Sequence, residues 1–512
     1  MKKLPIGIQT FDKIIEEDFL YIDKTQKIHQ LITSGDYFFL SRPRRFGKSL
    51  TISTIKAIYD GKASLFRGLW IADKWNWNKK NPVIHIPFNE IGYKSLGLAE
   101  ALNRFLDEQA DLYSIKLEAS VYDQKFRELI RKLSVKEKVV ILIDEYDKAI
   151  IDYLGTETAQ ALTHQQILKN FYSIIKSSDP YIELLLITGV SKFSKIGIFS
   201  DLNNLNDITF DWRFAELTGY TQKELEFYFE PYFQMVLDRN NFTELTELLS
   251  QVRYWYNGYS WDAECFVYNP FSVLSYFATG EFRNYWFETG TPSFLLELMK
   301  AENKYQLSKL KVNQAAFSSY DIENLKALPI LFQTGYLTIK QKLPYRYVLD
   351  YPNNEVRESM LQYILADLSN DDPGLTTNFI LNLQEAFYED DLDQVMELLQ
   401  SIFARIPHQI FIANKEAYYH SLLYIVFHFL KLYTVAAEVS TNKGRIDAVI
   451  ETPRHIYIIE FKLNESAAVA LTQIKENGYP EQYASRKKPI VLVGINFAEE
   501  KRGIQDWIVE RI

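Results

Sequence analysis

One stretch constrains the fold more than any other, the segment 38–50 with the sequence FFLSRPRRFGKSL. Its first residues are apolar and typical of a strand, a polar loop follows, and Gly47-Lys48-Ser49 come just before a helix-like segment, 51–59. In such a loop, backbone N–H groups and the helix N-terminus face an anion, a lysine reaches the outer phosphates, and a serine hydroxyl holds Mg²⁺. The sequence therefore predicts a phosphate-binding P-loop.

The match to the general P-loop pattern is incomplete, because the usual first glycine falls at Arg42. On its own, Gly-Lys-Ser is a weak signal, so this stretch alone does not establish a nucleotide site. If the prediction is right, the residues of this loop that contact the nucleotide are Arg45, Phe46, Gly47, Lys48, Ser49 and Leu50.

A second stretch, 139–147 with the sequence VVILIDEYD, favours the nucleotide interpretation. A continuous apolar run is typical of a strand buried on both faces in a parallel sheet, and ligands of such sheets bind where the strands end. We expect Asp144, directly or through a water, to hold Mg²⁺ together with Ser49, and Glu145 to activate the attacking water. The alternative is a strand end with two solvated acids. With Gly47-Lys48-Ser49 upstream, the pattern favours an ATP·Mg²⁺ site.

A third apolar run, 181–190, predicts a further buried strand that ends at Thr188. Its hydroxyl could contact the terminal phosphate or the attacking water, but a hydroxyl at a strand end is also simply common, and both interpretations stay open. Strands that alternate with helices predict a three-layer α/β/α domain with a mainly parallel sheet over residues 1–215. The first 35 residues either cover the sheet edge or pack over the nucleotide base.

Composition narrows the remaining possibilities. A chain of 512 residues is long enough for about three domains. Its single cysteine, Cys265, excludes an internal disulfide and a cysteine zinc cluster, which fits a reducing cytoplasm. The N-terminus has no apolar leader, and the segment 422–432 is too short to cross a bilayer. The net charge of −9 argues against a wholly basic surface but leaves a local basic groove open.

From residue 216 to 374 the pattern changes to a mostly helical middle domain, with one helix expected from Thr221 to Asp238. The aromatic stretch 254–261 could stack bases, but we favour irregular segments whose turns are pinned by packed aromatic rings. The segment 371–374, Asp-Asp-Pro-Gly, is the expected linker to a third domain, 375–512.

The third domain carries a second cluster of polar residues. The segments 445–450 and 455–462 are rich in β-branched and aromatic residues around a turn-like ETPR, which predicts a hairpin. A turn centred between Pro453 and Arg454 places Asp447 directly opposite Glu460, with Cβ atoms about 5 Å apart, and Lys462 on the same face. Two carboxylates suit Mg²⁺, which would polarise a phosphodiester while Lys462 stabilises the developing charge.

Neighbouring segments could support this site. A helix expected from Lys415 to Leu432 carries Glu416 and His420 on one face, and Gln473 and Tyr479 follow the hairpin. The alternative is a solvated hairpin face with a Glu–Lys pair. The order helix, hairpin, helix and the apolar surroundings favour a metal site.

With both sites described, the chain resembles the bacterial family of AAA-ATPase-like proteins that carry a C-terminal PD-(D/E)XK nuclease domain. The segments that carry the resemblance, over nearly the whole chain, are 4–9, 21–25, 42–49, 142–147, 188–191, 256–259, 269–270, 444–447 and 460–462. The resemblance implies an ATP-binding domain of the AAA/STAND type and a restriction-endonuclease-like α/β domain. In the family pattern the first glycine of the P-loop is also absent, and Asp447, Glu460 and Lys462 take the nuclease positions.

The sequence therefore predicts an ATP-binding and ATP-hydrolysing enzyme coupled to Mg²⁺-dependent cleavage of nucleic acid. DNA is favoured over RNA as the partner, but the sequence leaves the choice between them open. Glu145, Asp447, Glu460 and Lys462 are the expected catalytic residues, and Ser49, Asp144, Asp447 and Glu460 the metal ligands. We expect no membrane contact and leave a homo-oligomer open. The alternative is a nucleotide switch or scaffold whose nuclease-like domain binds but does not cut.

Overall fold

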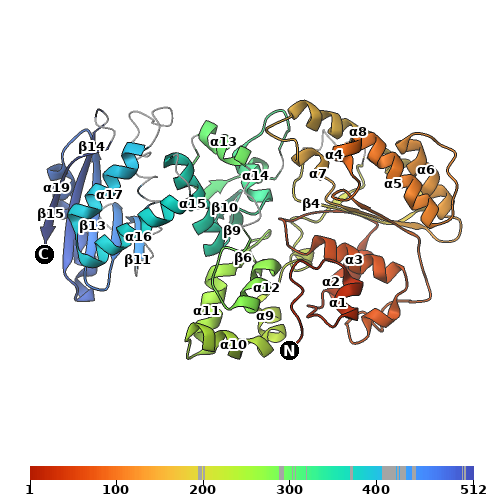
Figure 1. The fold of residues 1–512 in the computed structure, drawn as a ribbon, viewed down its shortest axis with the longest axis horizontal. Helices are drawn as coiled ribbons and strands as arrows, with labels where there is room; N and C mark the ends of the chain where they lie inside the picture. Colours follow the sequence, from red (N-terminus) through yellow and green to blue (C-terminus); the bar gives the residue numbers. More distant parts are fainter. Residues whose placement is uncertain are drawn as a thin grey trace. The chain divides into compact units, whose positions relative to one another are not determined.

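The structure is a computed structural model in which contacts divide the chain into two compact units, residues 1–357 and 358–512 (Figure 1). It describes residues 1–193, 199, 202–286, 293–302, 304–305, 307–318, 320–369, 373–405, 423, 426, 434–440, 445–498, 500 and 503–512. The separate middle domain and its boundaries stay predictions. Among the helices so described, none combines the length and the apolar character that a membrane span requires.

A five-stranded sheet forms the centre of the first unit. Its strands, in spatial order, are β2 (Val83–Pro87), β3 (Val139–Asp144), β4 (Ile182–Gly189), β1 (Tyr37–Ser41) and β5 (Asn206–Asp207). All four pairings are parallel, as the apolar runs predicted. Because Ser41 pairs with Gly189 and Pro87 with Asp144, the ends of these strands meet at one edge of the sheet.

Helices cover both faces of this sheet (Figure 1). One face carries α1 (Phe11–Glu16), α2 (Thr25–Ser34) and α3 (Lys48–Tyr59), and the other carries α4 (Tyr93–Leu96), α5 (Leu98–Leu112), α6 (Tyr122–Leu133), α7 (Lys148–Ile151) and α8 (Thr158–Ser177). On the first face, Ile52 and Ile55 of α3 pack with Leu142 and Leu186 of the strands. The three-layer α/β/α prediction is confirmed.

A helical region follows, and its core is aromatic. It contains α9 (Gln222–Tyr228), α10 (Glu230–Asn240), α11 (Leu245–Tyr256), β6 (Asn257–Tyr259), β7 (Val267–Tyr268) and α12 (Pro270–Thr279). The rings of Phe229 and Phe277 stack with centroids 4.7 Å apart, and Tyr256 is fully buried. The aromatic residues of this region therefore fill a hydrophobic core, as favoured from the sequence.

Two details of the predicted middle region are wrong. Residues 221–238 do not form one helix, because α9 ends before Phe229 and α10 begins at Glu230. Pro231 lies in the first turn of α10, where its missing N–H is tolerated, whereas inside a continuous helix it would remove a hydrogen bond. The stretch 254–261 is also not irregular throughout, since its first residues end α11 and the next three form β6.

The rest of the first unit adds a small antiparallel sheet to further helices. The elements are α13 (Ser293–Glu302), β8 (Leu310–Val312), α14 (Ala327–Gln333), β9 (Thr338–Leu343) and β10 (Arg346–Asp350), with the strand order β8-β10-β9. The next helix, α15 (Asn354–Ser369), begins in the first unit and continues into the second. Tyr320 and Gln333 of this part contact the segment that follows β4. This region therefore contacts the edge of the sheet at which the predicted site lies.

The second unit is a mixed sheet with helices on both faces. Its elements are α16 (Pro373–Glu389), α17 (Leu392–Arg405), β11 (Thr434–Ser440), β12 (Arg445–Glu451), β13 (Ile456–Leu463), α19 (Ala467–Glu476), β14 (Ile490–Ala498) and β15 (Gly503–Arg511), and the strand order is β11-β12-β13-β14-β15. Only β13 and β14 pair in parallel. Ile458 packs on α19, whereas the neighbouring Tyr457 contacts Phe387 of α16 on the opposite face.

Two sequence predictions for this unit lie wholly or partly outside the described residues. The helix 415–432, with Glu416 and His420, is one of them, and Asp371 and Asp372 of the linker are the other. Pro373 and Gly374 begin α16, so the prediction that they belong to a linker is wrong. Proline is well suited to the first turn of a helix, and for this reason a Pro-Gly pair there does not mark a loop.

Candidate functional sites

The P-loop runs from the end of β1 into the first turn of α3. Gly47 has a φ of 87°, a left-handed conformation that glycine adopts without strain, and it precedes the first helical residue. The Lys48 ammonium donates hydrogen bonds to the carbonyl oxygens of Arg42 and Pro43, over 2.9 and 2.8 Å. Burial lowers the pKa of Lys48, and the carboxylates of Asp144 and Glu145 act in the opposite direction. The carbonyl oxygens of the loop thus hold the Lys48 ammonium in place beside the loop.

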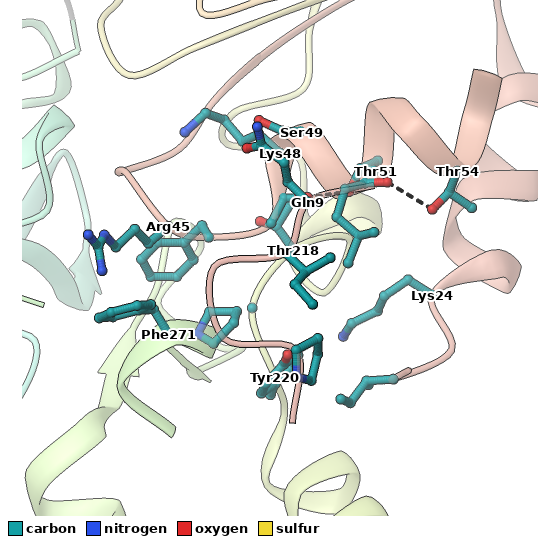
Figure 2. Close-up of a pocket in the computed structure, with 18 of the residues that line it drawn as sticks. Gln9, Lys24, Arg45, Lys48, Ser49, Thr51, Thr54, Thr218, Tyr220 and Phe271 are labelled. Atoms are coloured by element: carbon teal, nitrogen blue, oxygen red, sulfur yellow. Dashed lines mark hydrogen bonds between the residues drawn. The ribbon is translucent and has the colours of Figure 1, made fainter. Parts of the chain in front are cut away.

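Arg42, at the position of the missing first glycine, does not face the nucleotide side of the loop. Its side chain is buried, donates to the carbonyl oxygens of Ser41 and Thr209, and lies over the ring of Trp261 at 3.9 Å. Arg45 likewise lies over the ring of Phe271, at 3.7 Å (Figure 2). Two P-loop arginines therefore join the loop to the helical region.

Asp144 and Thr188 meet at the ends of adjacent strands. The Thr188 hydroxyl donates to Asp144 Oδ1 over 2.6 Å, and the backbone N–H of Glu145 donates to the same oxygen over 3.1 Å. Glu145 has a positive φ of 52°, which is uncommon for a residue with a side chain. Burial raises the pKa of Glu145. The turn after β3 therefore fixes the Asp144 carboxylate and directs Glu145 away from the strand, which suits a residue that accepts a proton.

Asp147, three residues after Asp144, has a structural role that the sequence pattern did not predict. Its Oδ2 accepts the backbone N–H groups of Val190 and Ser191, over 3.0 and 2.5 Å. A Cβ atom on Gly189 would come within 2.7 Å of Asp147 Oδ1 and of the Tyr146 ring, so only glycine fits between the two strand ends. Two residues in the sequence could have indicated this role. They are Asp147, an acid just after one apolar strand, and Gly189, at the end of the next apolar strand.

A cavity of about 470 Å³ opens beside the P-loop (Figure 2). The predicted residues that line it are Arg45, Phe46, Gly47, Lys48, Ser49, Leu50 and Glu145, whereas Asp144 and Thr188 are not among its lining residues. Five residues that the sequence patterns did not predict as part of this site also line the cavity, namely Gln9, Lys24, Thr218, Tyr220 and Phe271. These come from the N-terminal segment and from residues after β5, so the first 35 residues do border the predicted nucleotide site.

Lys24 lies at the opposite end of this cavity from Lys48, with Gln9 and Thr218 between them (Figure 2). Its ammonium donates to both carboxylate oxygens of Glu224, each over 2.6 Å. Glu224 also caps α9 by accepting the backbone N–H of Thr221. This buried ion pair joins residues 200 positions apart, so sequence spacing alone could not reveal it.

In the second unit, the register predicted for the hairpin is confirmed. Strand β12 pairs with β13 so that Ala448 is opposite Ile459 and Glu451 is opposite Ile456, which places Asp447 opposite Glu460. Backbone pairing stops at Ala448, and beyond it Asp447 Oδ2 accepts the N–H of Phe461 over 2.8 Å. The carboxylate therefore enters the gap where the two strands separate.

The two carboxylate oxygens of Glu460 differ in their hydrogen bonding. Gln473 of α19 donates to Oε1, and Oε2 has no hydrogen-bond partner in the part of the chain that the structure describes. Only 2% of Glu460 is exposed, and this burial, with the nearby charge of Asp447, raises its pKa to about 8, against the effect of Lys462. A buried acceptor beside a second carboxylate fits a divalent cation, which would satisfy the oxygen and favour the ionised form.

Neither candidate metal site depends on a large cluster of ligands. No group of three or more His, Cys, Asp or Glu side chains suited to a metal gathers among the described residues. The first candidate combines Ser49 and Asp144, and the second combines Asp447 and Glu460. In both, the remaining ligands of the ion would be phosphate oxygens and water, which is how Mg²⁺ is usually bound.

Comparison with known proteins gives the class of each region. Residues 5–199 match the family described as predicted AAA-ATPase, and residues 414–507 match the PD-(D/E)XK nuclease superfamily. The chain therefore combines an AAA-ATPase-like region with a nuclease-superfamily region, the two folds that surround the sites described above.

One full-length relative comes from Azotobacter chroococcum and is described only as an uncharacterized protein in the vnfD 5′ region. It is 39% identical over 531 residues, an alignment that covers 100% of this chain and 99% of the relative. The chain belongs to the family of AAA-ATPase-like proteins with a C-terminal PD-(D/E)XK nuclease domain.

Proposed function

We propose that the chain binds and hydrolyses ATP at the cavity beside the P-loop. The observation that carries this proposal is that Lys48, Ser49 and Glu145, from two separate segments, line the same cavity. The N-terminus of α3 and Lys48 bind the phosphates, and Ser49 with Asp144 would hold Mg²⁺. Glu145 accepts a proton from the attacking water, and Thr188 fixes the carboxylate of Asp144 from behind.

We further propose that the second unit cleaves nucleic acid at Asp447, Glu460 and Lys462, with DNA as the preferred substrate. The pairing of two carboxylates at the point where β12 and β13 separate supports this role. With Mg²⁺ bound, such a pair polarises a phosphodiester and lowers the pKa of a water. Lys462 places its positive charge on the same face, where it stabilises the charge that develops.

The two activities are proposed to be coupled, with the nucleotide state governing cleavage. The support is that both matched regions occur in one chain, and that a relative aligns with it from end to end. A chain that binds ATP but cleaves no substrate would instead be a nucleotide switch or scaffold.

Equilibrium binding of labelled ATP tests the first site. We expect Lys48→Ala to weaken ATP binding roughly 100-fold or more, because the variant loses the only side-chain cation that the loop encloses. Lys56→Ala is the control, since Lys56 lies on the same helix but forms a partly exposed ion pair with Asp60. Equal ATP affinity of the wild type and Lys48→Ala would contradict the assignment.

A further inference from the structure

The P-loop carries three arginines within four residues, and two of them are immobilised. Arg42 is buried under Trp261 and bonded to two carbonyl oxygens, and Arg45 is stacked on Phe271. Both aromatic partners lie in the segment 261–271, and Phe271 lines the cavity together with Arg45. Neither guanidinium is available to follow a reacting group without breaking these contacts.

Arg44 differs from both. It is exposed and lines the cavity together with Lys48 and Glu145. Within the described part of the chain its guanidinium has no hydrogen-bond or ion-pair partner. Its backbone, in contrast, is anchored, because the indole N–H of Trp286 donates to the Arg44 carbonyl oxygen over 3.3 Å. A fixed backbone with an uncommitted cationic side chain is therefore presented to the cavity.

The position of Arg44 relative to the proposed chemistry is informative. Its positive charge lies near enough to act on both Lys48, the proposed phosphate ligand, and Glu145, the proposed base. The terminal phosphoryl group of a bound nucleotide must lie between those two residues, because one binds it and the other faces the water that attacks it. Of the two arginines that line the cavity, Arg45 is stacked on Phe271, so Arg44 is the one placed to act on the reacting group.

We propose that Arg44 is a catalytic residue that donates hydrogen bonds to the terminal phosphoryl group of ATP bound to its own chain. The proposal rests on the ATPase function proposed above. In the reaction, the water oxygen forms a bond to the terminal phosphorus, and the bond from phosphorus to the bridging oxygen of ADP breaks. The water proton passes to Glu145, and ADP leaves with the bridging oxygen and its electron pair.

An arginine suits this role better than a lysine. The planar guanidinium presents a fork of N–H groups that matches two phosphoryl oxygens at once, and it stays charged at any pH of interest. Charge accumulates on these oxygens in the transition state, so contacts with them accelerate the reaction more than they strengthen ATP binding. An arginine supplied in this way removes the need for one from a neighbouring subunit.

The test compares Arg44→Ala and Arg44→Lys with the wild type in the full-length protein. We expect Arg44→Ala to lower kcat for ATP hydrolysis about 10³-fold while the Kd for ATP changes less than about threefold. Arg44→Lys should lie between the two. The control is Arg104→Ala, an exposed arginine on α5 paired with Glu108, which should hydrolyse ATP like the wild type. An unchanged kcat in Arg44→Ala would overturn the proposal.

Two further measurements separate the possible explanations. ADP with aluminium fluoride mimics the reacting phosphoryl group, and Arg44→Ala should bind ADP normally but fail to trap it in that complex. Mixing Arg44→Ala with Glu145→Gln should not restore hydrolysis, and recovery would show that the arginine acts between chains, contrary to the proposal.

The outcomes distinguish failure of the ATPase assignment from failure of the role of Arg44. If the wild type does not bind ATP, the ATPase assignment itself fails. If the wild type hydrolyses ATP and Arg44→Ala does so equally, only the role of Arg44 fails.

Discussion

The hydroxyl of Thr188 donates a hydrogen bond to Oδ1 of Asp144 over 2.6 Å, and both side chains are buried at the ends of adjacent parallel strands. Thr188 does not line the cavity, whereas Glu145, the residue after Asp144, does. The contact therefore favours a positioning role for Thr188, which acts through Asp144 rather than on the nucleotide.

Replacing Thr188 by valine tests this role, because valine keeps the shape and removes the hydroxyl. In the variant, the buried Oδ1 of Asp144 loses the hydrogen bond from the Thr188 hydroxyl. We therefore expect the free energy of unfolding to fall by about 1–3 kcal/mol. We also expect kcat for ATP hydrolysis to fall about tenfold or more, with a smaller change in ATP affinity. Thr163→Val, at an exposed helical threonine bonded to its own helix, is the control. A wild-type kcat would contradict the positioning role.

Gln473 should act in a similar way in the second unit. It donates to Glu460 from α19, and the loss of a partner that orients a metal ligand typically weakens metal binding 10–100-fold. We expect Gln473→Ala to raise the Mg²⁺ or Mn²⁺ concentration needed for half-maximal cleavage by roughly that factor. The neighbouring Thr472→Ala is the control, because the exposed Thr472 hydroxyl donates to the carbonyl of Ala468 in its own helix. Metal titrations that coincide for the two variants would exclude the role.

Asp147 predicts a pH dependence of stability. Burial raises its pKa from 3.8 to about 6, so the folded chain holds this proton more tightly than the unfolded chain does. The stability that Asp147 contributes is therefore greatest below pH 4 and falls by about 3 kcal/mol as the pH rises to about 6. Asp147→Asn carries no charge and escapes this loss, while its amide oxygen can still accept from Val190 and Ser191.

The measurement is the midpoint of chemical denaturation between pH 4 and pH 7. The difference between Asp147→Asn and the wild type should shift in favour of the variant across that range. A difference that stays constant across this range would show that the Asp147 carboxylate does not titrate as described.

Arg42 allows a test of the unusual P-loop. Arg42→Gly restores the first glycine of the general pattern but removes the stacking on Trp261 and the bonds to two buried carbonyl oxygens. We expect the variant to lose about 2–4 kcal/mol of stability without any gain in ATP affinity. Arg213→Ala, which removes an arginine paired locally with Asp211, should have a much smaller effect. Tighter ATP binding by Arg42→Gly would show that the general pattern is the better one here.

Patterns that are local in the sequence predicted their structures well. The apolar runs that end at Asp144 and Thr188 are adjacent parallel strands, because a run buried on both faces has few other places in an α/β domain. The hairpin register followed from the turn alone, since strand side chains alternate with a period of two. These features depend on neighbouring residues only.

Contacts between distant segments could not be predicted in this way. Arg42 and Trp261 are 219 positions apart, and Lys24 and Glu224 are 200 apart; neither pair has a spacing that a periodic pattern would reveal. The break between α9 and α10 is different, because a local signal, Pro231, marks it within otherwise helix-like, aromatic surroundings. The start of α9 also has a local signal, the capping box of Thr221 and Glu224.

The most direct test of the account is a cleavage assay on labelled double- and single-stranded DNA and RNA with Mg²⁺ or Mn²⁺, with and without ATP. Asp447→Asn is the informative variant, because its amide oxygen can still accept the N–H of Phe461 while the charge is lost. We predict that the wild type cleaves DNA, that Asp447→Asn does not, and that ATP alters cleavage by the wild type but not by Lys48→Ala. Equal cleavage by Asp447→Asn, or ATP binding with no cleavage of any substrate, would contradict the account.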